Sequence, residues 1–117
     1  MAWEVEFNDE FEEWWNTLDP REQDSVDVAV RLLEDKGPHL PYPSSSGIFG
    51  SRHSGMRELR IQHRGKPYRV LYAFDPRRVA ILLLGGAKTG GARWYASHVP
   101  KADVLYDIHL SQIETEE

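Results

Sequence analysis

The sequence has no cysteine among its 117 residues. This absence excludes disulfide bridges, cysteine-based zinc sites and cysteine nucleophiles, and it fits a reducing compartment. Long apolar runs are also missing, since the longest one (residues 79–84) is far too short to cross a bilayer. The acidic N-terminal residues lack the basic and apolar regions of a secretory signal, so we expect a cytoplasmic protein with no membrane partner.

The length and composition describe a small globular domain. The chain is 40% hydrophobic and 28% charged, and four Trp, five Tyr and four Phe supply large side chains for a core. A chain of 117 residues is too short for two ordinary domains. We therefore predict a single domain over residues 1–117.

The chain has fewer basic than acidic residues, and most of the basic residues lie in one segment. The net charge is −5, yet residues 52–93 hold ten of the 14 Lys and Arg and only two of the 19 acidic residues. Such segregation indicates a basic surface for a polyanion. The alternative is that strands flanked by arginines and acidic helices give this distribution without any ligand.

The first third of the chain predicts a strand and two helices. Residues 3–7 alternate between apolar and acidic side chains, as a half-buried strand does. Asn8 and Asp19 are helix N-caps, and Pro20 suits the first position of the second helix. Gly37 and the proline after it end that helix, so the two helices are antiparallel neighbours.

The rest of the chain predicts a loop, three strands and a final helix. Residues 38–55 are rich in Pro, Gly and Ser and have no periodicity. Strand patterns follow at 56–62, 67–75 and 78–86, then a flexible glycine-rich loop, and Pro100 opens the last helix. The order β-α-α-β-β-β-α predicts an α+β fold, in which a small antiparallel sheet packs against two N-terminal helices and a C-terminal helix.

Two arginines are predicted to face each other in this sheet. If the strands pair through a turn at 63–66, Arg60 and Arg69 are cross-strand neighbours. Adjacent guanidinium groups repel unless an anion lies between them, and a phosphate fits their forked geometry. The alternative is a pair of surface arginines bridged to Glu58 and to the acidic helices.

The segment GGAKTGG (85–91) is rich in glycine like a phosphate-binding loop, but it does not match the sequence motif of such loops. Leu82 and Ala87 stand where the motif requires glycine, and the residues that follow are poor helix formers. Lys88 between glycines still suits a close approach to a backbone phosphate. A solvated lysine in a glycine-rich turn is the alternative.

Aromatic and histidine side chains add candidates near the basic strands. Arg93, Trp94 and Tyr95 join a cation to two rings, a combination that binds single-stranded RNA, although Trp94 also suits a core position. The five histidines lack metal-ligand spacing, so we predict no metal site. Three of them are candidates for acid–base chemistry (His53, His63 and His98), whereas His109 fits a packed helix face.

The motifs ELRI (58–61), YRVLYAF (68–74) and WYASHVPKADVLYDIHL (94–110), with the lysine loop at 85–91, resemble toxins of the RelE/HigB type. The resemblance is strongest to the phage-derived, Gp49-like branch and extends over residues 5–110. It implies a toxin of a type II toxin–antitoxin system that cleaves mRNA on the ribosome without metal or cofactor. It also implies a cognate antitoxin, a helix-turn-helix protein of the HigA or Xre kind.

The resemblance assigns roles to individual residues. Arg69 and Arg60 would stabilise the reacting phosphate, with Lys88 and Tyr95 as further catalytic groups. Glu58 occupies a position that is basic in some relatives, so it is either an acid–base group or the ion-pair partner of Arg60. RNA-binding roles fall to the neighbouring basic and aromatic side chains, namely Arg57, Arg64, Lys66, Arg93 and Trp94.

Two alternative functions remain open for this scaffold. One is a ParE-like toxin that acts on gyrase, which would cause DNA-damage signalling without RNA cuts. The other is a non-catalytic binding module that keeps only the antitoxin surface, and its overexpression would be harmless.

Overall fold

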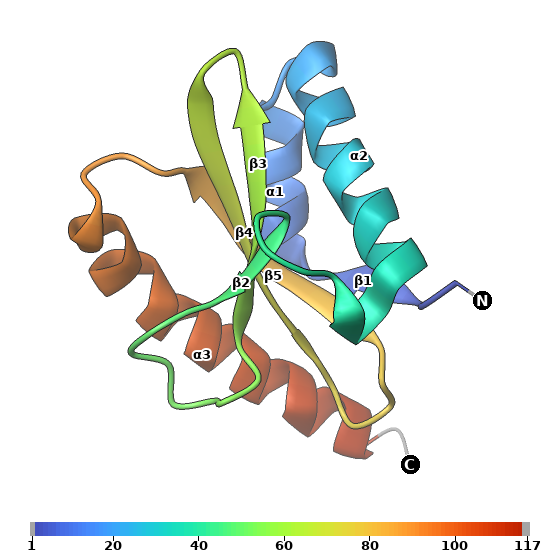
Figure 1. The fold of residues 1–117 in the computed structure, drawn as a ribbon. Coiled ribbons are helices and arrows are strands. Elements are labelled where there is room, and N and C mark those ends of the chain that lie inside the picture. Colours follow the sequence, from blue (N-terminus) through green and yellow to red (C-terminus); the bar gives the residue numbers. More distant parts are fainter. Residues whose placement is uncertain (1, 116–117) are drawn as a thin grey trace.

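The computed structural model describes residues 2–115, which form a five-stranded sheet between helices (Figure 1). The elements in chain order are β1 (Val5–Phe7), α1 (Asp9–Thr17), α2 (Pro20–Lys36), a short 3-10 turn (Gly37–His39), β2 (Ser45–Gly47), β3 (Arg57–His63), β4 (Lys66–Phe74), β5 (Ala80–Ala87) and α3 (Ala92–Thr115). The predicted α+β class, with two N-terminal helices and one C-terminal helix, is confirmed. None of the helices in residues 2–115 is long and apolar enough to cross a membrane.

The strands lie in the order β1-β5-β4-β3-β2. The pairs β3–β4 and β4–β5 are antiparallel, as predicted, and β2 pairs antiparallel with β3, whereas β1 runs parallel to β5. Helices α1 and α2 cover one face of the sheet and α3 covers the other (Figure 1). Each face therefore has its own hydrophobic core.

The N-terminal helices begin where the sequence predicts. The Asn8 side chain accepts a hydrogen bond of 2.8 Å from the Phe11 amide. Asp19 and Glu22 form a reciprocal capping box with bonds of 2.8 and 2.9 Å, and Pro20 follows the cap. These local contacts satisfy backbone donors that a helix start leaves free.

Strand β2 lies inside the segment that was predicted to be a loop. Its three residues show no alternation of apolar side chains, so the pattern gave no signal. The strand forms because β3 offers it a paired edge and because Ser45, fully buried, shares a hydrogen bond of 2.6 Å with the Tyr72 hydroxyl. Tertiary contacts thus create this edge strand.

Helix α3 begins at Ala92, eight residues before the predicted start at Pro100. Gly90 and Gly91 adopt positive φ angles of 78° and 55°, which turn the chain directly from β5 into the helix. Burial of Trp94 against the sheet fixes the first turn. Pro100 lies within the helix on its exposed side, where one missing amide is tolerated.

The alternation of β3 and β4 decides which side chains meet α3. Leu59, Ile61 and Val70 point into the core beneath α1 and α2. Their neighbours along each strand point to the opposite face, which places Glu58, Arg60 and Arg69 beside the start of α3. Arg60 and Arg69, the two arginines predicted to be neighbours, therefore lie on the face of the sheet that is covered by α3, close to the start of that helix.

Candidate functional site

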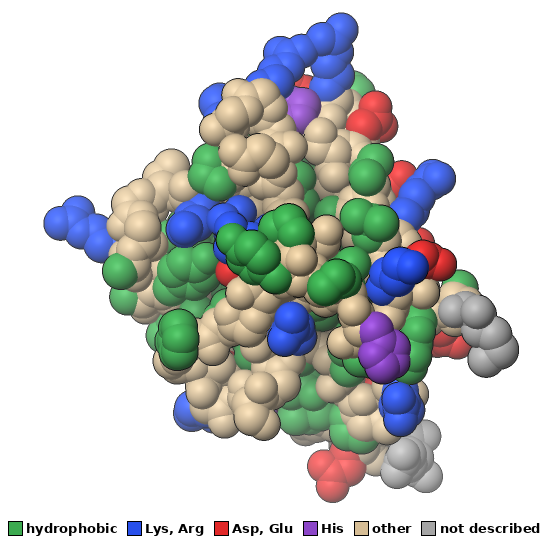
Figure 2. Space-filling model, in the orientation of Figure 1, with side chains coloured by type: hydrophobic (Ala, Val, Ile, Leu, Met, Phe, Trp, Pro, Cys, Tyr) green, Lys and Arg blue, Asp and Glu red, His purple; other side chains and the backbone are tan. Residues whose placement is uncertain are grey.

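Arg60 and Arg69 are direct cross-strand partners of β3 and β4, so the predicted register is confirmed. The Arg60 side chain is 28% exposed and that of Arg69 only 5%. Figure 2 shows Lys and Arg side chains spread over this side of the molecule, with hydrophobic side chains between them. Two guanidinium groups thus lie side by side, one of them almost entirely buried.

The anion beside the two arginines is Glu58. Its Oε2 lies 3.2 Å from Nη1 of Arg60, and its Oε1 lies 3.3 Å from Nε of Arg69. The Glu58 residue is only 3% exposed. Within residues 2–115 the acidic helices form no ion pair with either arginine, so Glu58 alone neutralises the pair. The chain's own carboxylate occupies the position for which we considered a phosphate.

Arg69 retains unused hydrogen-bonding capacity. Its Nη1 donates a bond of 3.0 Å to the Tyr68 carbonyl. Its Nε is close enough to Glu58 for charge attraction but is not aligned for a hydrogen bond, and it is a buried donor without a partner among the described residues. Buried donors of this kind are rare and are often found at functional sites.

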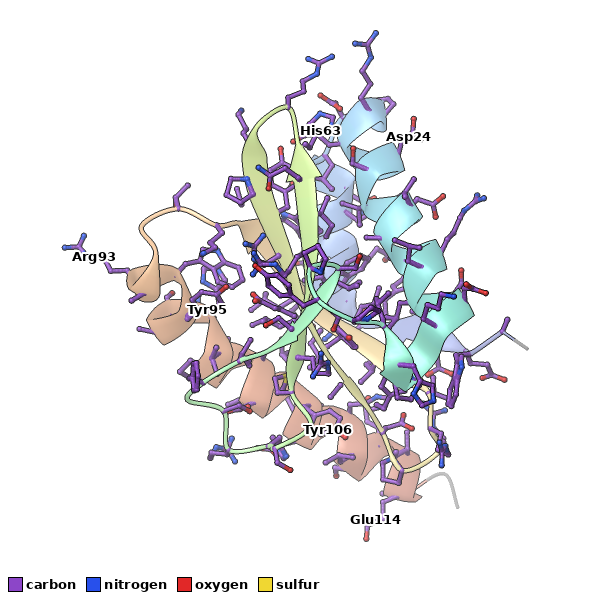
Figure 3. The ribbon with its side chains drawn as sticks, viewed as in Figure 1. Asp24, His63, Arg93, Tyr95, Tyr106 and Glu114 are labelled. Atoms are coloured by element: carbon purple, nitrogen blue, oxygen red, sulfur yellow. The ribbon has the colours of Figure 1, made fainter. Side chains whose placement is uncertain are left out.

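Tyr95 reaches the same carboxylate from α3. Its hydroxyl donates a hydrogen bond of 2.6 Å to Oε1 of Glu58, and Figure 3 shows the ring between the helix and the sheet. Burial raises the pKa of Tyr95, and the hydrogen bond to Glu58 raises it further. The phenol is therefore protonated near neutral pH and acts as a donor rather than a base.

Lys88 is held close to Tyr95. Its backbone amide donates a bond of 2.8 Å to the Pro67 carbonyl, and its Nζ lies 5.4 Å from the centre of the Tyr95 ring. This distance allows a cation–π contact. The lysine after β5 thus lies next to the residue that contacts Glu58, and its predicted contact with a backbone phosphate stays a prediction.

A pocket of about 370 Å³ opens onto this group. Glu58 and Tyr95 form part of its wall, and the other lining residues are Ser46, Gly47, Ile48, Phe49 and Ala92. The buried carboxylate is therefore reachable from solvent through the pocket. The residues of β2 and those directly after it complete the pocket. This part of the lining was not recognisable in the sequence because it depends on the pairing of β2 with β3.

Trp94 does not belong to the predicted RNA-binding surface. It is 4% exposed, and its ring stacks on His98 with centroids 4.1 Å apart. A Cβ atom added at Gly86 would lie 3.2 Å from its Nε1, so the indole packs directly on the sheet. The core alternative for Trp94 is correct, because no ring face is left for a nucleotide base.

The other predicted RNA-binding residues are dispersed. The Arg57 Nε donates a bond of 3.1 Å to the Ser45 hydroxyl, on the face of the sheet beneath α1 and α2 and so opposite to Glu58. Arg64 and Lys66 are exposed at the turn of the β3–β4 hairpin, which stands away from α3 (Figure 1). Arg93 points away from the sheet (Figure 3). None of these side chains contacts Glu58 within residues 2–115.

The histidines occupy separate environments. His63 contacts the Ser25 hydroxyl at 2.7 Å near the hairpin turn, and His53 pairs with Asp107 at 2.7 Å. His98 Nδ1 lies 2.7 Å from the Trp94 carbonyl, which can only accept, so this nitrogen carries a proton. Within residues 2–115 no three His, Asp or Glu side chains are grouped as metal ligands.

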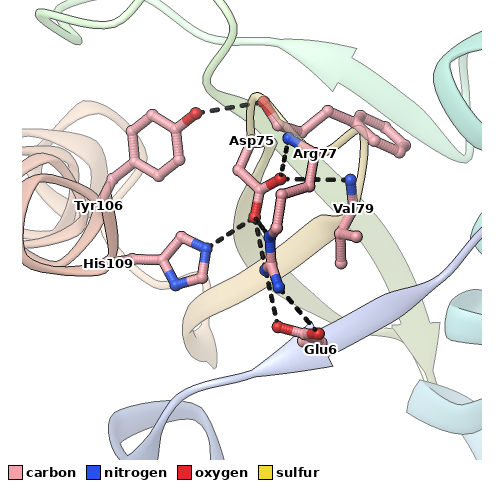
Figure 4. A network of polar contacts seen from close by, with 7 residues as sticks. Glu6, Asp75, Arg77, Val79, Tyr106 and His109 are labelled. Carbon is pink, nitrogen blue, oxygen red and sulfur yellow. Dashed lines mark hydrogen bonds and ion pairs between the residues drawn. The ribbon is translucent and has the colours of Figure 1, made fainter. Parts of the chain in front are cut away.

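A second polar network lies at the other end of the sheet (Figure 4). Asp75 receives hydrogen bonds from Arg77 and contacts His109 at 2.8 Å, while Arg77 also reaches Glu6. Burial alone would raise the pKa of Asp75, but the bonds from Arg77 and His109 and from backbone amides outweigh it and lower that pKa. The network joins β1, the β4–β5 turn and α3, and His109 is packed, as predicted.

Comparison with known proteins shows to which family this chain belongs. The model described as Phage derived protein Gp49-like (DUF891) matches residues 13–107. Two Mycobacterium tuberculosis proteins are similar in sequence. The one named "Putative toxin HigB2" is 41% identical over 103 residues (86% of this chain, 51% of that protein), and "Putative toxin HigB3" is 44% identical over 93 residues (79% and 80%).

The chain spans about half the length of the first relative. Among solved structures, a mutant of the E. coli toxin RelE in the free state has a TM-score of 0.59 at 17% identity, covering 86% of this chain and 98% of that one, which is a likeness of fold. The resemblance inferred from the motifs is confirmed. This chain belongs to the phage-derived Gp49-like family, within the RelE/HigB type.

Proposed function

We propose that the protein is the toxin of a type II toxin–antitoxin system and acts as a metal-independent endoribonuclease on mRNA. The main observation behind this proposal is that Arg60, Arg69 and Tyr95 all contact the Glu58 carboxylate, which lines an open pocket. The similarity to relatives named as toxins supports it. The resemblance adds ribosome-bound mRNA as the substrate, which would place the activity in the cytoplasm.

The proposed reaction is attack of a ribose 2′-hydroxyl on the adjacent phosphate. A bond forms between the 2′-oxygen and phosphorus, and the bond from phosphorus to the 5′-oxygen breaks. The products are a 2′,3′-cyclic phosphate and a free 5′-hydroxyl. Negative charge grows on the phosphorane oxygens, where Arg60 and Arg69 supply two cationic forks.

The protons move through Glu58 and Tyr95 in this proposal. Glu58 accepts the proton of the attacking 2′-hydroxyl, and Tyr95, whose pKa is raised, gives its proton to the departing 5′-oxygen. Their hydrogen bond of 2.6 Å then lets Glu58 return a proton to Tyr95, so both groups regain their starting states. Lys88, close to the ring, stabilises the phenolate that forms in between.

An antitoxin is part of the same proposal. Relatives named as toxins imply a cognate partner that keeps the activity in check. We infer a helix-turn-helix protein of the HigA or Xre kind from the family resemblance. The partner protein is expected to protect a host cell in which both genes are expressed.

The test is induction of the protein in bacteria, followed by growth measurement and mapping of new RNA 5′ ends. Wild type is expected to stop growth and to produce new 5′-hydroxyl ends, while Arg60→Ala and Arg69→Ala produce neither. Arg31→Ala is the matched control, because Arg31 is exposed on α2 and pairs with Asp27. Thermal unfolding of Arg69→Ala separates loss of catalysis from loss of fold, since Arg69 is buried.

Three outcomes contradict the proposal. Growth arrest with DNA-damage signalling and no RNA cuts favours a gyrase-directed toxin. Harmless expression of the folded wild type favours a binding module. Undiminished cutting by the folded Arg69→Ala variant removes the catalytic assignment.

A further inference from the structure

Two residues that line the pocket have no part in the proposed chemistry. They are Ile48 and Phe49, which follow β2 directly. Phe49 is 97% exposed, the highest value among the large hydrophobic side chains described. A fully exposed aromatic ring beside a buried carboxylate is a feature that packing of the chain does not explain.

The segment that carries this ring is firmly attached to α3. The carboxylate of Asp103, 2% exposed, accepts bonds from the Ser51 hydroxyl (2.5 Å) and the Arg52 amide (2.9 Å). Asp107 pairs with the Arg52 guanidinium and with His53, both at 2.7 Å. These bonds hold the chain at Ser51 and Arg52, two and three residues after Phe49, so the segment that carries the ring is anchored to α3.

The surroundings of the pocket suit a nucleic-acid base. Cations lie beside the pocket, because Arg60 and Arg69 both contact the Glu58 carboxylate that lines it. The Ser46 hydroxyl adds a polar group, and β2 is an edge strand with backbone groups that face away from β3. Apolar faces, polar edges and a nearby cation are what a base attached to a phosphate chain requires.

We propose that this pocket binds one nucleobase of the RNA next to the scissile phosphate, with the Phe49 ring stacked on the base. The inference rests on the proposed function, since the phosphate between Arg60 and Arg69 would bring the neighbouring base to the pocket. Charge complementarity selects RNA over an apolar peptide, because Arg60 and Arg69 contact Glu58 and Lys88 lies over the Tyr95 ring, which gives three cations against one acidic group at the pocket. Phe49 is thus a binding residue that influences which nucleotide lies at the cut.

The test uses purified protein and short, non-cleavable 2′-O-methyl oligoribonucleotides in which one abasic nucleotide is moved along the sequence. Phe49→Ala is expected to weaken binding of the intact oligonucleotide by about 5- to 150-fold, the range for loss of one stacked base. This loss should vanish when the abasic nucleotide occupies the Phe49 position. Phe49→Tyr should bind like wild type.

The matched control is Val104→Ala, because Val104 is 52% exposed on α3 and lies outside the pocket. It should bind every oligonucleotide as wild type does. In cells, Phe49→Ala should still cut RNA, with a flatter base preference at one position beside the cut. The Phe49→Tyr variant should retain the wild-type preference.

Equal affinity of wild type and Phe49→Ala for the intact oligonucleotide, or no measurable binding by wild type, overturns the subsite. If RNA is cut in cells while Phe49→Ala changes neither affinity nor preference, the subsite fails and the proposed cleavage stands. If binding depends on Phe49 but no RNA is cut, the cleavage proposal fails and the subsite stands. A Phe49-dependent loss that persists with every abasic oligonucleotide also overturns stacking on a base.

Discussion

The hydroxyl of Tyr95 lies 2.6 Å from Oε1 of Glu58 and donates a hydrogen bond to it, which joins α3 to β3. The sequence left open whether Glu58 is a base or only the partner of Arg60. Its carboxylate does both in our proposal. It holds Arg60, Arg69 and Tyr95 in place before RNA binds, and it accepts a proton when the reaction begins.

Removal of the Tyr95 hydroxyl tests its catalytic role. We expect Tyr95→Phe to slow RNA cleavage by about 10²-fold or more, the usual effect of losing a general acid. Stability should change by only about 1 kcal/mol, since one partly buried hydrogen bond is lost. Cleavage rate and urea unfolding measure the two effects.

Tyr106→Phe is the matched control for that experiment. It makes the same change on the same helix, and the Tyr106 hydroxyl donates to the Phe74 carbonyl away from Glu58. Cleavage by this variant should equal that of wild type. Equal rates for Tyr95→Phe and Tyr106→Phe would remove Tyr95 from the mechanism.

Neutralising Glu58 should affect both activity and stability. Glu58→Gln leaves two adjacent guanidinium groups without their anion, and Arg69 is buried with it. Loss of one member of a buried pair costs about 3 kcal/mol in free energy of unfolding. We expect this loss in urea unfolding, together with loss of RNA cleavage.

The double variant Glu58→Gln, Arg69→Met separates those two effects. It removes both buried charges, so most of the lost stability should return while cleavage stays absent. A double variant no more stable than Glu58→Gln would mean that the stability loss has another origin than the unpaired arginine.

The Asp75 network predicts a loss of stability in acid. The pKa of Asp75 is lowered in the folded protein from the ordinary value of 3.8. The unfolded chain therefore takes up the proton first, and the stabilisation is present above about pH 4 and is lost as pH falls through the lower folded pKa. The difference in unfolding free energy between wild type and Asp75→Asn should shrink over this range, whereas a constant difference would contradict the prediction.

The hydrogen bond between Ser45 and Tyr72 tests the unexpected strand β2. Ser45→Ala leaves the Tyr72 hydroxyl, in a residue that is 1% exposed, without this partner. The expected cost is about 1–3 kcal/mol in urea unfolding. Ser45→Ala combined with Tyr72→Phe should cost less than Ser45→Ala alone, because no buried hydroxyl remains unpaired.

Local patterns were enough to predict much of the site. The turn at 63–66 and the alternation of β3 and β4 fix the pairing of Arg60 with Arg69 without further context. Helix caps at Asn8 and Asp19 also depend on residues a few positions away. Such features follow from short-range geometry, which the sequence displays directly.

Features that depend on distant contacts were missed. Strand β2 exists through its pairing with β3, and the first turns of α3 depend on burial of Trp94 against Gly86. The attachment of residues 51–53 to Asp103 and Asp107 joins segments about 50 positions apart. Neither periodicity nor composition signals such contacts.

We expect Glu58 also to make the free protein selective among anions. Because it belongs to the same chain, it competes for Arg60 and Arg69 at a high effective concentration that dilution cannot lower. An isolated phosphate or sulfate ion must displace this carboxylate with its own charge alone. A phosphate within a polynucleotide is helped by the other contacts that the polynucleotide makes with the protein. Glu58 should therefore stay paired with the two arginines until a polynucleotide binds.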